Sequence, residues 1–191
     1  MAQKPLIIYP FSEARKLQFE SLVKDRKYNN IILTVPSSAK ESICGLIRTE
    51  FDSPGVVLVI SPYIKRINDE IEYLQNMDIS AITITSETII PEREHIYASF
   101  SHKFFYATPE MIKKGYQEVK SFIHRILRSE NCTVVFEEAD MILFTFRTDF
   151  GHLPNVRESF SNTQWIALTD GNIENIASAL SMENYETVTM G

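Results

Sequence analysis

The stretch Ile31-Ile-Leu-Thr-Val-Pro-Ser-Ser-Ala-Lys-Glu-Ser-Ile-Cys44 reads as an apolar β-strand, a short polar turn and the start of a helix. That order is typical of a phosphate-binding loop, in which backbone N–H groups at a helix N-terminus hold an anion. The Walker A pattern, G-x-x-x-x-G-K-[ST], needs glycines so that the backbone can approach the phosphates. Here Ser38 and Lys40 stand where glycines are expected, and Glu41 replaces the lysine. Ser42 keeps the hydroxyl that would face magnesium.

The composition is that of a globular protein. The chain has 191 residues, of which 44% are hydrophobic and 23% charged, and we expect one domain over residues 1–191. Cys44 and Cys132 lie far apart in apolar runs, which favours reduced, buried thiols of an intracellular protein, nuclear or cytoplasmic, over a disulfide. No apolar run approaches the roughly 18 residues that span a bilayer, so we expect no membrane partner. The formal charge of −6 argues against a wholly basic nucleic-acid wrapper but allows a local basic strip.

Apolar runs alternate with helical patterns along the chain. Residues 56–60 are apolar throughout, as in a parallel strand buried on both faces. Ser61-Pro62 and Thr108-Pro109 each predict an N-cap with proline at the first helical position. The chain therefore predicts an α/β fold, a three-layer parallel sheet with helices on both faces. The expected strands are 31–35, 56–60, 81–85, 104–107, 132–136, 165–169 and 186–189; the expected helices are 11–30, 41–51, 62–76, 91–96, 109–127 and 173–180.

In such a sheet, ligands bind outside the carboxyl ends of the strands. The informative residues are those that follow the strands, at 37–42, 61–65, 108–110, 137–140 and 169–171. V-P-S-S-A-K-E-S-I-C at 35–44 is similar to M-P-T-G-x-G-K-S-L-C, V-I-S-P-Y-I-K at 59–65 to V-V-S-P-L-I-S, and F-Y-A-T-P-E-M at 105–111 to L-Y-I-A-P-E-R. V-F-E-E-A-D at 135–140 stands where V-D-E-A-H is expected, and I-A-L-T-D-G at 166–171 where A-L-T-A-T is expected. Together these segments resemble the N-terminal RecA-like lobe of a RecQ-type DEAD/DEAH-box helicase.

The resemblance implies a nucleotide site made by Gln18 and by the loop residues Ser37, Ser38, Lys40, Glu41 and Ser42. It also implies ATP and magnesium as cofactors if the altered loop still binds them. A carboxylate at Glu41 would repel the phosphates that a lysine attracts. Each unit-charge interaction is worth about 4 kcal/mol at ~4 Å and an effective dielectric of ~20. We therefore expect no bound cofactor, unless Lys40 restores a phosphate contact after rearrangement.

The segment at 135–140, which we call the second motif, also departs from the family pattern. Glu137 replaces the aspartate that holds magnesium in the family, and its longer side chain displaces the carboxylate. Ser42 and Glu137 are the implied metal ligands, with an acidic strand end that binds nothing as the alternative. Glu138 keeps the carboxylate that positions water and is the implied catalytic residue. Asp140 replaces the histidine that in the family links hydrolysis to the segment at 166–171, which we call the third motif.

The resemblance implies nucleic-acid contacts after the second and fourth strands, through Ser61, Lys65, Arg66, Thr108 and Lys113. The alternative is that these residues are helix caps and solvated lysines. Three functions stay open: a degenerate lobe that binds or scaffolds without ATP hydrolysis, the first lobe of an active ATP-dependent helicase, and a protein–protein adaptor. The second function would require a second helicase lobe, which we expect to be absent from this chain.

Overall fold

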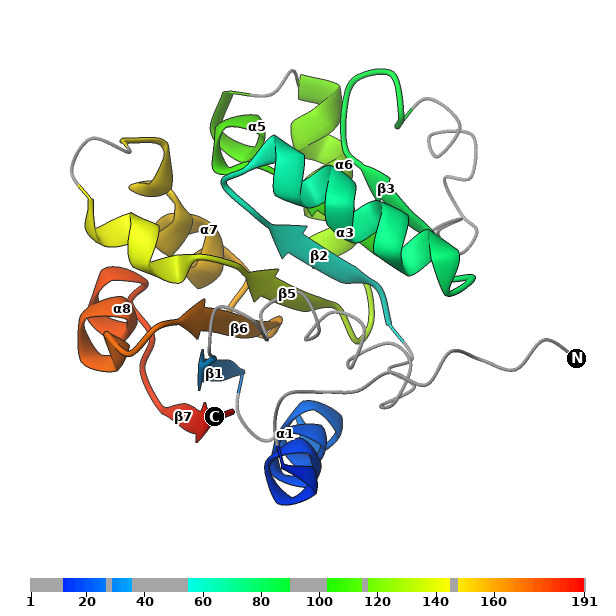
Figure 1. The fold of residues 1–191 in the computed structure, drawn as a ribbon. Coiled ribbons are helices and arrows are strands. Elements are labelled where there is room, and N and C mark those ends of the chain that lie inside the picture. The colour runs from blue at the N-terminus through cyan, green and yellow to red at the C-terminus, as the bar shows by residue number, and fades with distance from the viewer. Residues whose placement is uncertain are drawn as a thin grey trace, which may run out of the picture.

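A computed structural model describes residues 12–26, 29–35, 55–89, 103–114, 117–144 and 148–190. Its centre is a seven-stranded, all-parallel sheet with the order β3-β4-β2-β5-β6-β1-β7 (Figure 1). The strands are β1 (Asn30–Thr34), β2 (Val57–Ile60), β3 (Ala81–Thr83), β4 (Phe104–Ala107), β5 (Thr133–Phe136), β6 (Gln164–Thr169) and β7 (Tyr185–Thr189). The predicted fold class, a parallel sheet covered by helices, is confirmed.

The helices are α1 (Glu13–Asp25), α3 (Ile64–Asn76), α5 (Pro109–Lys114), α6 (Gln117–Leu127), α7 (Leu153–Ser159) and α8 (Ile173–Ala179). Two short 3₁₀ helices, η2 (Ala139–Leu143) and η3 (Thr148–Phe150), follow β5. Of the single helix expected over 109–127, the structure describes two segments, α5 and α6. Residues 115–116, between the two segments, lie outside the described residues.

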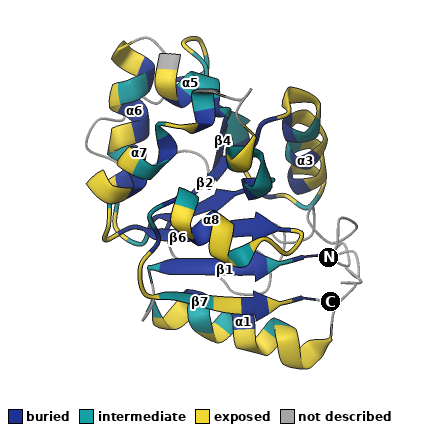
Figure 2. Ribbon diagram, turned by 90° about the vertical axis from the view of Figure 1, so that its left-hand side faces the viewer, coloured by how far each residue is buried: buried dark blue, intermediate teal, exposed yellow. Residues whose placement is uncertain are grey.

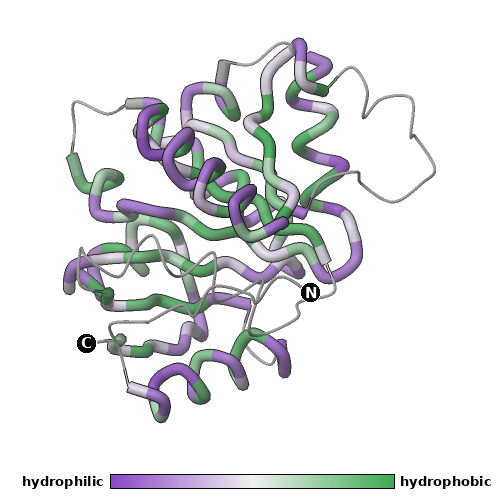
Figure 3. The backbone as a smooth tube through the Cα atoms, turned by 45° about the vertical axis from the view of Figure 1, so that its right-hand side comes forward, coloured by the Kyte–Doolittle hydropathy of each residue, from purple (hydrophilic) through white to green (hydrophobic). Residues whose placement is uncertain are grey.

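Side chains on successive strand positions point to opposite faces, so the sheet separates two hydrophobic clusters. One cluster joins Phe19 and Val23 of α1 and Ile67 of α3 to one face of the sheet. The other joins α5, α6, α7 and α8 to the opposite face, where Trp165 of β6 is buried. Figure 2 shows buried strands between helices whose outer surfaces are exposed, and Figure 3 shows hydrophobic strands beside helices of mixed hydropathy. Continuous apolar strand runs are therefore explained by burial on both faces.

The predicted helix starts have different outcomes. Thr108 caps α5 as expected, because its hydroxyl accepts a hydrogen bond from the Met111 N–H at 3.2 Å. The prediction that Ser61 caps a helix beginning at Pro62 is wrong, since α3 begins at Ile64 and Tyr63 is its N-cap. The Ser61 N–H still donates to the Ala107 carbonyl oxygen at 3.1 Å. Sheet pairing therefore continues through Ser61 and delays the start of the helix.

Cys132 is a buried free thiol, as predicted, while Cys44 lies outside the described residues. Burial raises the pKa of the Cys132 thiol to about 12, so the thiol stays protonated at neutral pH. Of the helices in the described ranges, none is long and apolar enough to cross a bilayer.

Candidate functional site

Parallel pairing brings the ends of four strands to one edge of the sheet. Thr34 of β1 pairs with Thr169 of β6, and Ile60 of β2 pairs with Phe136 of β5. The Val35 N–H donates to the Thr169 carbonyl oxygen at 3.1 Å. The segment after β1 therefore starts beside the end of β6. This carboxyl edge is where the residues predicted from the motifs should meet.

The loop residues predicted to bind nucleotide, Ser37, Ser38, Lys40, Glu41 and Ser42, lie outside the described residues. Gln18 is described, on the exposed side of α1, where its side-chain oxygen accepts a hydrogen bond from Arg15 at 3.2 Å. The structure therefore leaves the nucleotide-binding residues of the loop as a prediction.

Arg66, in the first turn of α3, lies among three carboxyl groups at the carboxyl edge. Its Nε is 3.1 Å from Oε1 of Glu70 and 3.5 Å from Oε2 of Glu137. Its Nη1 donates to Oε1 of Glu138 at 2.6 Å. Burial alone would lower the pKa of Arg66, but the carboxylates of Glu137, Glu70 and Glu138 outweigh it and raise that pKa above its usual value. The four side chains form one ion-pair cluster, which we call the Arg66 cluster.

Glu137 is the most enclosed member of the Arg66 cluster, with 0% of its side chain exposed. Burial and the adjacent Glu70 raise the pKa of Glu137 well above its usual range, while Arg66 and the Ser61 hydroxyl oppose that shift. Two carboxyl groups can hydrogen-bond to each other only if one is protonated. Burial and the nearby Glu70 therefore favour the protonated form of the Glu137 carboxyl group.

Glu138 reaches Arg66 through an unusual backbone conformation. Its φ of 49° and ψ of 45° lie in the left-handed region, which non-glycine residues seldom adopt. This turn ends β5, begins η2 and directs the Glu138 side chain toward Arg66. The implied water-positioning carboxylate therefore makes a short ion pair with a guanidinium.

A magnesium ion does not fit the described part of this site. Glu137, the implied metal ligand, has no exposed surface and is occupied by Glu70, Arg66 and Ser61. Ser42, the second implied ligand, lies outside the described residues. Within the parts of the chain that the structure describes, no group of three His, Cys, Asp or Glu side chains is placed to hold a metal ion.

Asp140 joins the ends of β5 and β6. Its carboxylate accepts hydrogen bonds from Thr169 Oγ1 at 2.8 Å, the Asp170 N–H at 3.1 Å and Asn172 Nδ2 at 3.0 Å. Thr169 Oγ1 in turn accepts from the N–H groups of Gly171 and Asn172. The position expected to link the second and third motifs therefore contacts the third motif, with a carboxylate in place of an imidazole.

Asp140→Asn is expected to destabilise the protein more at pH 7 than at pH 3. Partial burial raises the pKa of Asp140, but hydrogen bonds from Asn172, Thr169 and Asp170 hold it below the ordinary 3.8. A carboxyl group whose pKa is lower in the folded than in the unfolded state stabilises the fold at pH values above its unfolded-state pKa. That stabilisation is lost as the pH falls through the folded-state pKa. Urea unfolding of the wild type and of Asp140→Asn between pH 3 and pH 7 measures the difference between their free energies of unfolding. A difference in unfolding free energy that widens toward low pH would contradict the role of the charged carboxylate.

The residues predicted to bind nucleic acid differ in exposure and in their partners within the chain. Ser61 is buried, Arg66 is in the Arg66 cluster, and Thr108 caps α5. Lys113 is 3.5 Å from Asp149, whereas Lys65 is 91% exposed and 3.3 Å from Asp69. Sequence reasoning missed Glu70, although its spacing of four residues from Arg66 on a helix is a recognisable ion-pair signal.

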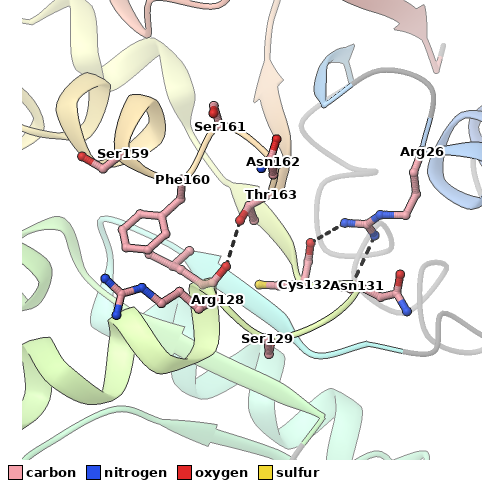
Figure 4. A pocket seen from close by; sticks show the side chains of 11 residues that line it. Arg26, Arg128, Ser129, Asn131, Cys132, Ser159, Phe160, Ser161, Asn162 and Thr163 are labelled. Atoms are coloured by element: carbon pink, nitrogen blue, oxygen red, sulfur yellow. Dashed lines mark hydrogen bonds between the residues drawn. The ribbon is translucent and has the colours of Figure 1, made fainter.

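A cavity of about 480 Å³ lies at the opposite, amino edge of the sheet (Figure 4). Arg26 enters it with a guanidinium that donates to the carbonyl oxygens of Cys132, at 2.7 Å, and Asn131, at 3.4 Å. Thr163 donates to the Leu127 carbonyl oxygen at 2.9 Å. These contacts fix α1 and α6 to the starts of β5 and β6, so they stabilise the fold at this edge.

Comparisons with known proteins agree with this architecture. No protein-family model matches the chain. The helicase domain of Hef from Pyrococcus furiosus superposes with a TM-score of 0.58 and 16% identity, covering 94% of this chain and 40% of that one. The fold is therefore that of a RecA-like helicase domain.

The sequence relatives are more specific. The chain is 24% identical over 94% of its length to the ATP-dependent DNA helicase hus2/rqh1 of Schizosaccharomyces pombe. It is 27% identical over 85% of its length to the ATP-dependent DNA helicase Q1 of Rattus norvegicus. Its homologues are thus RecQ-family helicases, as the motifs predicted. The chain spans 16% of the first relative and 27% of the second.

Proposed function

We propose that this chain is a RecQ-like helicase lobe that does not hydrolyse ATP and serves as a nucleic-acid-binding or scaffolding module. The observation that carries the proposal is the burial of Glu137, which has no exposed surface at the implied magnesium position. Burial and the neighbouring Glu70 raise the pKa of its carboxyl group well above the usual range, which favours the protonated form, whereas magnesium binds ionised carboxylates. The substitution of Glu41 for the phosphate-binding lysine supports the same conclusion from the sequence.

Isothermal titration with ATP and magnesium tests the catalytic half of this proposal. We expect neither saturable heat at micromolar protein nor release of phosphate. Saturable micromolar binding followed by turnover would overturn the proposal. A triple variant, Ser38→Gly with Lys40→Gly and Glu41→Lys, measures what the loop alone contributes. A gain of binding without turnover would assign the loss of binding to the loop and the loss of hydrolysis to the second motif.

The active-helicase alternative is favoured by the two relatives described above, both of which are named ATP-dependent DNA helicases. The two functions differ in what the Arg66 cluster must do. An active lobe would have to release Glu138 from Arg66 before it could position water. Phosphate release by the wild-type chain, with nucleic acid present as well as absent, would favour the active lobe.

The nucleic-acid half of the proposal rests on the helicase relatives and on Lys65, an exposed cation after β2. We expect fluorescence anisotropy to detect weak binding of a single-stranded oligonucleotide at low salt that weakens as salt rises. Lys65→Glu should weaken binding, by about tenfold or less for one phosphate contact. Lys24→Glu, which changes an exposed lysine of α1, is the matched control. Absence of binding at low salt would instead favour a protein–protein adaptor.

A further inference from the structure

The Arg66 cluster arranges three carboxyl groups around one guanidinium, which differs from a metal site. Glu70 and Glu137 have 2% and 0% of their side chains exposed, and Glu138 has 21%. Glu70, Glu137 and Glu138 each place a carboxyl oxygen within 3.5 Å of a guanidinium nitrogen of Arg66. Arg66 supplies one positive charge and directs two of its nitrogens at them. Its guanidinium has a planar fork of donors that suits carboxylate oxygens.

A divalent cation needs the same oxygens in a different geometry. Magnesium binds carboxylate oxygens at about 2.0–2.1 Å in a near-octahedral shell that usually retains water. In the Arg66 cluster the oxygens are spread around a guanidinium, and both Glu137 and Glu70 are closed to water. A cation that approached Glu138 would also meet the positive charge of Arg66, 2.6 Å from the carboxylate. The guanidinium and a metal ion therefore exclude each other.

We propose that Arg66 takes the place of a divalent cation at the carboxyl edge, so that Glu70, Glu137 and Glu138 are held together without metal. The inference rests on the proposed function, because it explains why the second motif keeps two carboxylates in a lobe that does not hydrolyse ATP. In this arrangement the carboxylates connect α3 to the end of β5. The ion pairs keep the edge folded whether or not magnesium is present.

Titration with Mn²⁺ alone, followed by electron paramagnetic resonance, tests this inference without nucleotide. The wild-type chain is expected to show only weak background binding. Arg66→Leu, which removes the cation, is expected to gain a site at least about tenfold tighter. Arg66→Lys keeps one positive charge and should behave as the wild type does. Wild-type binding as tight as that of Arg66→Leu, or no gain in Arg66→Leu, would overturn the inference.

Two further variants allow the inference to be tested even if Arg66→Leu does not fold. Arg66→Gln retains amide donors and removes only the charge, so it should gain the Mn²⁺ site even if Arg66→Leu does not fold. Adding Glu138→Gln to either variant should abolish the gain, which assigns the site to the Arg66 cluster. A melting temperature of the wild-type chain that rises when EDTA is replaced by Mg²⁺ would also overturn the inference. ATP turnover would refute the proposed function separately, because none of these measurements contains ATP.

Discussion

Gly55→Ala is expected to destabilise the protein by about 3 kcal/mol or more, because the new methyl group would collide with backbone. A Cβ at Gly55 would lie 1.9 Å from the carbonyl oxygen of Asn131 and 2.4 Å from its carbonyl carbon. Gly55 precedes β2 and Asn131 precedes β5, and these two strands pair in the sheet. The methyl group can be accommodated only if the starts of the strands separate. Urea unfolding gives the change in free energy.

Gly171→Ala is the matched control for this prediction. No atom lies within 4 Å of a Cβ at Gly171, so the substitution meets open space. Its φ of +147° is a conformation that other residues seldom adopt, which costs about 1 kcal/mol. Equal losses in the two variants would show that backbone conformation, and not the collision with Asn131, determines the effect at Gly55.

Arg157→Leu is expected to cost about 3 kcal/mol, because it leaves buried acceptors without their donor. Arg157 in α7 is 7% exposed, and its Nε donates to the Leu180 carbonyl oxygen at 2.6 Å. The other two nitrogens donate to Asn30 Oδ1, at 3.3 Å, and to the Ser181 carbonyl oxygen. Arg157 therefore connects α7 to the start of β1 and to the turn after α8. Thermal and urea unfolding should both report the loss.

Arg128→Leu provides the comparison at an exposed arginine. The Arg128 guanidinium lies over the Phe160 ring, 5.8 Å from its centroid, in the wall of the amino-edge cavity. An exposed contact of this kind contributes about 1 kcal/mol or less. If Arg128→Leu were as costly as Arg157→Leu, general loss of surface charge would explain both results and the buried hydrogen bonds would not.

The sheet could be predicted because burial on both faces leaves a clear signal in the sequence. Residues 56–60 and 104–107 are apolar without alternation, and they are the pairing strands β2 and β4. The end of a strand is harder to predict. Ser61-Pro62 has the chemistry of a helix start, but the hydrogen bond from the Ser61 N–H to Ala107 comes from a neighbouring strand. The helix and strand propensities of Ser61 and Pro62 do not reflect a hydrogen bond to a neighbouring strand.

The sequence predicted where the candidate site lies, but it did not predict which side chains contact each other there. The motifs identified the ends of β5 and β6, and the structure brings Glu137, Glu138 and Thr169 to the same edge. Arg66 was predicted to hold a nucleic-acid phosphate, while the structure gives its guanidinium three carboxyl partners. Two of those partners, Glu137 and Glu138, lie about seventy residues away in sequence, directly after β5. Contacts between α3 and the turn after β5 depend on the packing of the sheet, which residue spacing does not encode.

The position of Trp165 has a practical consequence for all of these experiments. It is the single tryptophan of the chain, buried in β6 between its neighbours β5 and β1. Its emission spectrum should shift to longer wavelength only when water enters the middle of the sheet. An Arg66 variant that loses helical circular dichroism while its emission stays blue has loosened the edge around α3, and the central strands of that variant are intact.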